Sequence, residues 1–286
     1  MKYARSLLFI PADKKKMLDK IDDLSPDVFI LDLEDGVSTE NKETARNNIS
    51  TKLKSCDTKD KTMFIRLNGF DSNYIYEDIE KTIDEKIYGY MIPKFESVTK
   101  LKKLFDFISN KEKEKKIGSN KIKLILMIES SKGLVELYKL NSSLHDRVIA
   151  ICFGAEDYLF SLSGSAEASA EMMDFARKII ITYAKANNLL AIDTVFRNYK
   201  DDQGLKNELA KIRSFGFNSK LALHPAQINI INSAFTPTAD EIEKAKIILM
   251  HEKEIEEKGA ISINGVMYDL PHLKWAKKIE TYMEDI

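Results

Sequence analysis

The stretch that decides the fold is Leu124-Ile125-Leu126-Met127-Ile128, an unbroken apolar run that ends at Glu129. A strand with one face in water alternates apolar and polar residues, whereas a strand buried on both faces can be apolar throughout. The run Val28-Phe29-Ile30-Leu31 has the same character, and acidic residues follow it too. Both runs therefore indicate strands of a parallel sheet that is covered on both faces.

Eight short apolar or β-branched segments of this kind occur along the chain. They are Ser6–Pro11, Asp27–Leu33, Met63–Asn68, Gly89–Pro93, Lys123–Ile128, Val148–Phe153, Ala191–Phe196 and Lys220–His224. The segments between them have helical character, as in Lys14–Leu24 and Ser97–Ile108. Eight strand–helix units in about 230 residues predict a (β/α)8 barrel, a TIM barrel. An open doubly wound sheet is the alternative, but no Gly-x-Gly-x-x-Gly motif follows any of these strands.

Residues 236–286 remain after the predicted barrel. They contain a charged helix (Asp240–Glu257), a hairpin (Gly259–Met267) and a second helix (Leu270–Met283). We therefore predict a catalytic barrel of residues 1–235 and a C-terminal helix–hairpin–helix appendix of residues 236–286. An appendix of this size either caps its own barrel or reaches a neighbouring subunit.

The composition is that of a globular protein with a large core. The chain has 286 residues, of which 44% are hydrophobic and 31% are charged. Its net charge of −1 argues against a nucleic acid or an anionic membrane as partner. No apolar run approaches the roughly 18 residues of a membrane span, and the N-terminal one is too short for a signal peptide. Because Cys56 and Cys152 lie far apart and fit a reducing compartment, we predict a cytoplasmic protein.

Charged side chains are concentrated at the carboxyl ends of the predicted strands, where barrels carry their catalytic groups. In strand order these residues are Asp32, Glu34, Asp35, Arg66, Lys94, Glu129, Asp157 and His224. Structural salt bridges could account for any single member. Acidic groups after three strands, together with an arginine and a lysine, favour a catalytic site.

Carboxylates without histidine or cysteine partners suit a hard cation such as Mg²⁺. Glu129 and Asp157 end two consecutive strands and are the predicted pair of ligands. Arg66 could bind a substrate carboxylate or an enolate through its planar fork of N–H donors. A cation and an arginine that converge on one point would stabilise a developing oxyanion.

The other residues at the strand ends are assigned supporting roles around the metal. We expect Glu34 or Asp35 to orient metal-bound water, and Asp32 to be structural. Lys94 could form a Schiff base, as lysines do in other aldolases, but beside metal ligands it is interpreted as an ion-pair partner of the acidic cluster. We expect His224 to pack behind the catalytic groups.

An ordered series of motifs resembles the citrate lyase beta-subunit-like family of the HpcH/HpaI aldolase superfamily, and among its members the stand-alone citramalyl-CoA lyase type. The series runs over essentially the whole chain, with Ala12 where the family usually has glycine. It comprises Arg5-Ser6-Leu7-Leu8-Phe9-Ile10-Pro11, Asp32-Leu33-Glu34-Asp35-Gly36-Val37, Arg66-Leu67-Asn68, Pro93-Lys94, Ile128-Glu129-Ser130 with Gly133, Phe153-Gly154-Ala155-Glu156-Asp157, Ala191-Ile192-Asp193, Lys220 with His224-Pro225-Ala226-Gln227, and Gly265-Val266-Met267-Tyr268-Asp269-Leu270-Pro271.

The resemblance implies a Mg²⁺-dependent carbon–carbon lyase. Its substrate would be a 3-hydroxyacyl thioester such as citramalyl-CoA, malyl-CoA or a citryl thioester, cleaved to a keto acid and an acetyl thioester. The resemblance also implies Mg²⁺ ligation by Glu129 and Asp157, and substrate and enolate binding by Arg66. Asp269 would act as the acid/base in the active site of a neighbouring subunit, so a homo-oligomer, a trimer or a hexamer, is expected.

Binding of the coenzyme A carrier would involve the start of the chain. Lys16 and Lys20 lie four residues apart on the predicted first helix, at positions where CoA-using relatives contact the phosphates. Phe9, in the first strand motif, is assigned to substrate binding. Three alternatives stay open: the beta subunit of a citrate lyase complex acting on citryl-acyl-carrier protein, a metal-dependent aldolase on free acids, and a non-catalytic binding subunit.

Overall fold

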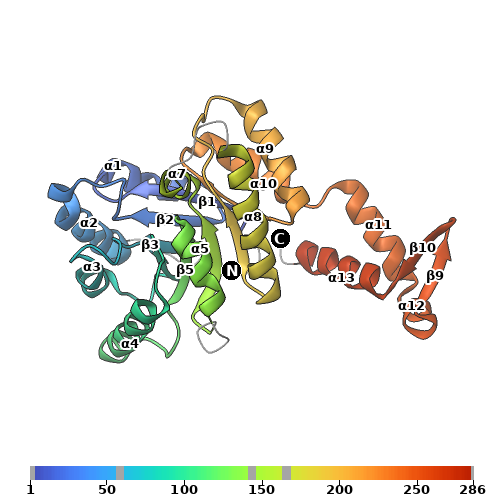
Figure 1. Cartoon of the computed structure of the whole chain (residues 1–286), viewed down its shortest axis with the longest axis horizontal. Helices are drawn as coiled ribbons and strands as arrows, with labels where there is room; N and C mark the ends of the chain where they lie inside the picture. Colours follow the sequence, from blue (N-terminus) through green and yellow to red (C-terminus); the bar gives the residue numbers. More distant parts are fainter. Residues whose placement is uncertain (1–3, 56–60, 141–145, 163–168, 285–286) are drawn as a thin grey trace. The chain divides into compact units, whose positions relative to one another are not determined.

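The computed structural model describes residues 4–55, 61–140, 146–162 and 169–284. Eight parallel strands close into a barrel in sequence order, and helices surround it (Figure 1). The (β/α)8 prediction is therefore confirmed. The strands are β1 (Ser6–Pro11), β2 (Val28–Asp32), β3 (Thr62–Arg66), β4 (Gly89–Ile92), β5 (Lys123–Ile128), β6 (Val148–Phe153), β7 (Leu190–Asp193) and β8 (Ser219–Ala222).

Helices and short 3-10 turns (η) connect the strands. They are α1 (Lys15–Leu18), η1 (Asp19–Asp23), η2 (Thr39–Asn41), α2 (Lys42–Ser55), α3 (Ile75–Thr82), α4 (Val98–Glu114), α5 (Ser131–Glu136), η3 (Leu137–Lys139), α7 (Ala155–Ser161), α8 (Ser169–Ala186), α9 (Asp202–Phe215), η4 (Pro225–Gln227) and α10 (Ile228–Phe235). The first predicted helix is wrong in one respect, because it changes from α to 3-10 geometry at Asp19. Lys16 therefore lies in the α-helical part of this segment and Lys20 in the 3-10 part.

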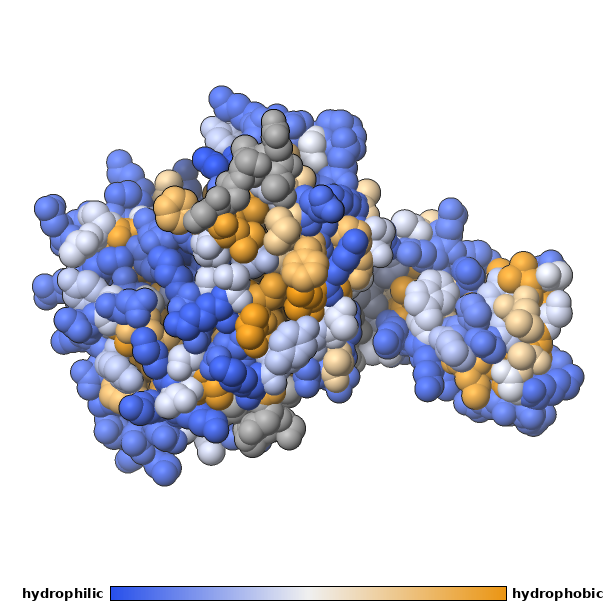
Figure 2. Space-filling model, viewed as in Figure 1, coloured by the Kyte–Doolittle hydropathy of each residue, from blue (hydrophilic) through white to orange (hydrophobic). Residues whose placement is uncertain are grey.

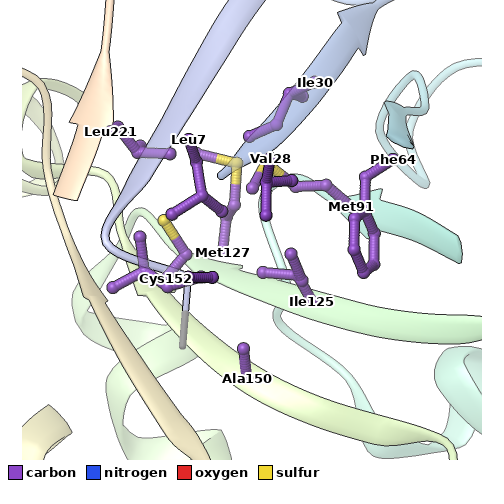
Figure 3. Close-up of a cluster of buried hydrophobic side chains, with 12 residues drawn as sticks. Leu7, Val28, Ile30, Phe64, Met91, Ile125, Met127, Ala150, Cys152 and Leu221 are labelled. Carbon is purple, nitrogen blue, oxygen red and sulfur yellow. The ribbon is translucent and has the colours of Figure 1, made fainter. Parts of the chain in front are cut away.

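The barrel interior is filled by alternate residues of the strands (Figure 3). The buried cluster consists of Ala4, Leu7, Val28, Ile30, Phe64, Met91, Ile125, Met127, Ala150, Cys152, Ile192 and Leu221. The intervening residues of β5, Leu124, Leu126 and Ile128, are also fully buried. Burial on both faces explains why this strand is apolar throughout.

Exposed apolar side chains gather on the helices that follow β5 and β6. Val135 on α5, Phe160 on α7 and Phe175 on α8 are all more than half exposed. Figure 2 shows apolar patches on a face that is otherwise largely hydrophilic. None of the helices within the described ranges is long and apolar enough to span a membrane.

The chain divides into two compact units, Met1–Ala234 and Phe235–Ile286. The second contains α11 (Ala239–Met250), α12 (Glu252–Lys258), the antiparallel pair β9 (Ala260–Ile263) and β10 (Val266–Asp269), and α13 (Leu270–Glu284). The predicted Asp240–Glu257 helix is wrong, because the chain breaks at His251 between α11 and α12. A small core of its own lies between these elements, formed by Ala245, Ile248, Ile255, Ile261, Leu273 and Ala276.

Gly89 lies where β4 passes close to β5, and this contact predicts a stability effect. A Cβ atom at Gly89 would lie 1.8 Å from the carbonyl oxygen of Lys123, a backbone atom that cannot move without disturbing the strand. We expect Gly89→Ala to lower the free energy of unfolding by about 3 kcal/mol or more. Gly118→Ala is the control, because nothing lies within 4 Å of its Cβ position. Equal urea denaturation curves for the two variants would contradict this account of the β4–β5 contact.

Candidate active site

A pocket of about 360 Å³ opens at the carboxyl ends of the strands. Six of the predicted site residues line it, namely Phe9, Asp32, Asp35, Arg66, Glu129 and Asp157. A larger groove of about 610 Å³ lies between α9 and α10, but no carboxylate lines it. The groups capable of catalysis therefore gather in the smaller pocket.

Arg66 and Asp32 form the fixed centre of this pocket. The Nε and Nη2 atoms of Arg66 donate to the two carboxylate oxygens of Asp32, both at 2.7 Å. The same oxygens also accept the backbone N–H groups of Glu34 and Gly36. Burial alone would raise the pKa of Asp32, but the charge and hydrogen bonds of Arg66 lower it below its ordinary value. The ring of Phe9 lies 4.6 Å from the guanidinium carbon, so Arg66 is held from two directions.

Lys94 joins two of the acidic groups. Its Nζ lies 2.9 Å from Glu34 Oε1 and 3.6 Å from Asp35 Oδ1, which is the ion pairing that the sequence predicted. Burial raises the pKa of Glu34 despite the nearby charges of Arg66 and Lys94. Lys94 has a left-handed backbone with φ of +47°, which is uncommon for a residue with a side chain. In this conformation its backbone N–H donates to Glu129 Oε2 at 2.6 Å.

Glu129 is a buried carboxyl group of the pocket with a strongly raised pKa. Burial, followed by the negative charge of Glu34, raises the pKa of Glu129 to about 7, although the Lys94 N–H and the charge of Arg66 act against this. The residue after β6 must be small here, because a Cβ at Gly154 would lie 2.4 Å from Glu129 Cγ. Gly154 thus lets the start of α7, which carries Asp157, pass directly beside Glu129.

The residues present fit a divalent cation. Arg66 is hydrogen-bonded to Asp32 and Lys94 to Glu34, so in the described ranges no side-chain cation forms an ion pair with Glu129 or Asp157. A cation beside these two carboxylates would offset the repulsion that raises the pKa of Glu129. Among the described residues no three His, Cys, Asp or Glu groups cluster as a complete metal cage. Two carboxylates suit Mg²⁺, which usually keeps positions for water and substrate oxygens.

Other predicted residues lie away from the pocket lining. His224 was expected to pack behind the catalytic groups, and this is wrong: its side chain is exposed and stacks on Tyr199, with ring centroids 4.4 Å apart. Its Nδ1 accepts the N–H of Ala226, so it caps its own turn. Lys16 and Lys20 are both exposed at the start of the chain.

Asp269 ends β10 in the second unit. Its Oδ1 lies 2.6 Å from Nδ1 of His272, and this hydrogen bond lowers the pKa of Asp269. At that distance one proton must lie between a carboxylate oxygen and a ring nitrogen. Both side chains are exposed in this chain.

Three residues of the site were given no role by the sequence analysis. Thr194 lines the pocket and accepts the N–H of Ala155 with its hydroxyl. Lys42 is buried and donates to the carbonyl oxygens of Leu33 and Glu34, both at 2.6 Å. Gly154 is the only one of the three with a readable signal, since it directly follows an apolar strand and precedes an acidic pair.

Comparison with known proteins places the chain in a family. Residues 5–225 match the family described as HpcH/HpaI aldolase/citrate lyase. The citrate lyase subunit beta of Leuconostoc mesenteroides subsp. cremoris is 30% identical, over 96% of this chain and 91% of that protein. The mitochondrial citramalyl-CoA lyase of Homo sapiens is 31% identical, over 99% and 86%. The chain therefore belongs to the HpcH/HpaI aldolase/citrate lyase family.

A solved structure extends the similarity to three dimensions. It is the protein CitE of Mycobacterium tuberculosis in complex with magnesium, acetoacetate and coenzyme A. The two chains share 26% of their residues and superpose with a TM-score of 0.78, over 98% of each chain. The barrel and the residues after it thus have counterparts in that protein.

The raised pKa of Glu129 predicts how stability depends on pH. The unfolded chain loses the proton of Glu129 near pH 4.5, whereas the folded, metal-free chain keeps it up to about pH 7. The stability contributed by the buried neutral acid is therefore complete below pH 4.5 and is lost as the pH rises towards 7. The total loss should be on the order of 3 kcal/mol.

Urea denaturation in the presence of a chelator, at pH values between 4.5 and 7.5, measures this effect. Glu129→Gln should flatten the pH dependence, because an amide does not titrate. Glu156→Gln is the matched control: it removes the same charge at the same mouth, but from a side chain that is 60% exposed. An unchanged slope in Glu129→Gln would show that other groups cause the pH dependence.

Proposed function

We propose that this member of the HpcH/HpaI family is a Mg²⁺-dependent carbon–carbon lyase that cleaves a 3-hydroxyacyl thioester to a keto acid and an acetyl thioester. The observation that carries the proposal is the pocket in which Glu129 and Asp157, without cations of their own, share a lining with Arg66. Relatives named citrate lyase subunit beta and citramalyl-CoA lyase support this reaction class. The magnesium and coenzyme A in the CitE structure support the cofactor and the thioester.

Glu129 and Asp157 would hold the metal. When bound, Mg²⁺ supplies a Lewis acid that fixes and polarises the oxygens of the hydroxy-acid head. Glu34 and Asp35 are proposed to orient water at this point, with Lys94 keeping both in place. The free thioester end would then point out of the pocket, towards solvent.

Arg66 would stabilise the negative charge that forms during cleavage. Its Nε and Nη2 atoms donate to Asp32, whereas Nη1 makes only a 3.2 Å ion pair with Glu34 and retains N–H groups for a substrate oxygen. Because Asp32 and Phe9 hold the guanidinium in place, these donors need no reorganisation when the charge appears.

The bond changes follow from the substrate. Loss of the hydroxyl proton turns the C–O bond into a carbonyl, the neighbouring C–C bond breaks, and its electron pair becomes the thioester enolate. Protonation of the enolate carbon gives the acetyl thioester. We assign the acid/base role to Asp269 of a neighbouring subunit in a trimer or a dimer of trimers. The exposed apolar residues Val135, Phe160 and Phe175 support such an assembly.

The thioester carrier has two candidates. Coenzyme A is favoured, with the exposed Lys16 and Lys20 as partners of its phosphates. The second is an acyl carrier protein, because the Leuconostoc relative is named as a subunit of citrate lyase. We place the reaction in the cytoplasm, where the unpaired thiol of Cys152 would stay reduced.

A thioester panel tests the activity. The purified chain with Mg²⁺ should release pyruvate, glyoxylate or oxaloacetate from at least one of citramalyl-CoA, malyl-CoA, citryl-CoA and citryl-acyl-carrier protein, measured by coupled reduction of the keto acid. Glu129→Gln and Asp157→Asn should each weaken Mg²⁺ binding about 10- to 100-fold or more and lower turnover at least as much. Glu156→Gln should behave like the wild type. Release of no keto acid from any of the four would rule out the lyase, and release of free thiol alone would indicate hydrolysis.

Subunit exchange tests the role of Asp269. Asp269→Asn and Arg66→Ala chains should each be inactive, because one lacks the acid and the other the enolate-binding cation. After exchange, mixed oligomers would contain some sites with both wild-type residues, so part of the activity should return. Fluorescence transfer between labelled chains verifies the exchange. Verified exchange without recovered activity would mean that Asp269 acts within its own chain or has no catalytic role.

A further inference from the structure

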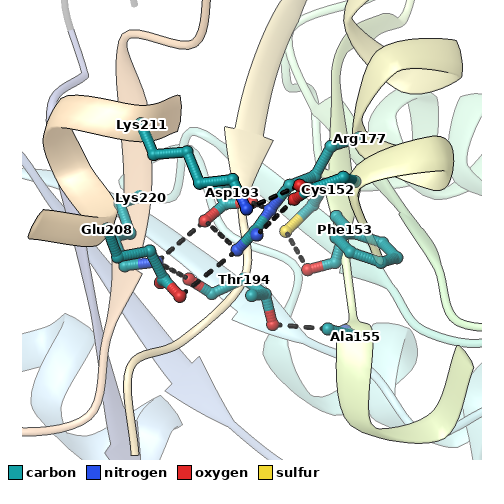
Figure 4. A network of polar contacts seen from close by, with 10 residues as sticks. Cys152, Phe153, Ala155, Arg177, Asp193, Thr194, Glu208, Lys211 and Lys220 are labelled. Carbon is teal, nitrogen blue, oxygen red and sulfur yellow. Dashed lines mark hydrogen bonds and ion pairs between the residues drawn. The ribbon is translucent and has the colours of Figure 1, made fainter. Parts of the chain in front are cut away.

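A network of buried charges lies between the barrel wall and the helices α8 and α9 (Figure 4). Lys220 on β8 and Asp193 at the end of β7 are both fully buried, with Nζ of Lys220 2.8 Å from Asp193 Oδ2. Arg177 on α8 donates its Nε to the other oxygen of Asp193 at 2.7 Å. Glu208 on α9 accepts from Lys220 and lies 3.5 Å from Arg177. The charges of these four residues balance.

One bond leaves this network in the direction of the pocket. The Nζ of Lys220 also donates to the carbonyl oxygen of Thr194 at 2.8 Å. The hydroxyl of the same Thr194 accepts the N–H of Ala155 at 3.2 Å, and Ala155 is the first residue of α7. Asp157 lies two residues further along this helix. A continuous path of hydrogen bonds thus joins Lys220 to the helix that carries Asp157.

Asp157 depends on such support more than Glu129 does. Glu129 is buried and held by the N–H of Lys94, whereas Asp157 is exposed and its carboxylate has no hydrogen bond to any residue in the described ranges. Its position is therefore set by the backbone of α7, a helix of only seven residues. Thr194 takes up the first free N–H group of this helix and links it to β7.

The ammonium group of Lys220 binds three acceptors that an apolar side chain could not bind. Burying an ammonium group costs several kcal/mol, so packing alone would be served as well by an apolar side chain. An ammonium has three N–H groups, and Lys220 directs them to Asp193, Glu208 and the Thr194 carbonyl. An apolar residue could fill the same space, but it would leave the Thr194 carbonyl unsatisfied and free to turn.

We propose that Lys220 is a positioning residue for the metal site: it fixes Thr194, which in turn fixes the start of α7 and hence Asp157. The inference rests on the proposed function, because it takes Asp157 to be a Mg²⁺ ligand. Lys220 itself touches neither metal nor substrate. Outer partners of this kind typically contribute a factor of 10 to 100 to metal affinity.

Calorimetry with Mg²⁺ alone, on the full chain, tests this series of hydrogen bonds at Thr194, its middle residue. Thr194→Val removes the hydroxyl but keeps the shape, so it should weaken Mg²⁺ binding about tenfold or more. Thr194→Ser keeps the hydroxyl and should restore near wild-type affinity. Lys220→Met should weaken binding to a similar extent. The double variant Lys220→Met/Thr194→Val should bind no more weakly than the weaker single variant, because both changes break one path.

Arg147→Met is the matched control for simple loss of a buried ion pair. Arg147 pairs with Glu112 at 2.9 Å, and both are buried, but Arg147 precedes β6 at the opposite end of the barrel from the pocket. It should lower the midpoint of thermal unfolding as Lys220→Met does, while its Mg²⁺ affinity stays that of the wild type.

The outcomes separate the inference from the proposed function. Wild-type Mg²⁺ affinity in Thr194→Val would contradict the proposal that Lys220 positions Asp157 through Thr194. Additive losses of Mg²⁺ affinity in the double variant would contradict it too. The lyase assignment would stand in both cases. An equal loss of affinity in Arg147→Met would also overturn the proposal, since general destabilisation would then be the cause. If Lys220→Met does not fold, the Mg²⁺ affinities of Thr194→Val and Thr194→Ser decide whether the Thr194 hydroxyl supports the metal site. Failure of the wild-type chain to bind Mg²⁺ would remove the metal site, and the inference with it.

Discussion

Burial of every barrel strand on both faces is the constraint on which the rest of this structure depends. Side chains that point inward fill the barrel, and those that point outward meet the helices, so β2 and β5 have no solvated face that could carry a charge. On these two strands, ionisable groups lie only at the strand ends. The acidic clusters after β2, β5 and β6 are a consequence of this arrangement, and closure of the barrel brings them to one mouth.

Within the mouth, the distribution of charge decides which groups can act. Arg66 is fixed by Asp32 with two hydrogen bonds, and Lys94 is paired with Glu34. These pairs use the available cations and leave Glu129 and Asp157 with excess negative charge. Burial is the main cause of the raised pKa of Glu129, and the negative charges of Glu34 and Asp157 add to it. A cation beside Glu129 and Asp157 would offset this repulsion, which supports the proposed metal site over structural salt bridges.

The sequence predicted the barrel and most of the mouth because both follow from local pattern. Apolar runs locate strands, and the residue after a run lies at the strand end whatever the rest of the fold does. Three kinds of detail were out of reach. The apolar pattern did not predict the change to 3-10 geometry at Asp19 or the break at His251. The outward direction of His224 depends on its own turn and on Tyr199, 25 positions earlier in the chain. The role of Thr194 depends on a bond to Ala155, 39 positions away.

Two backbone features around Glu129 lower the stability of the fold and serve the site instead. Lys94 has a left-handed backbone that costs about 1–3 kcal/mol, and in this conformation its N–H donates to the Glu129 carboxylate. Because Gly154 has no side chain, α7 can begin directly beside the same carboxylate. The Lys94 N–H stabilises the charged form of Glu129, and Gly154 leaves room for the start of α7 beside it. The core can support this cost because it is continuous through all eight strands. The strain, the missing side chain and the buried charge therefore all lie at the Glu129 carboxylate, which is consistent with the proposed role of Glu129 and Asp157 as ligands of one cation.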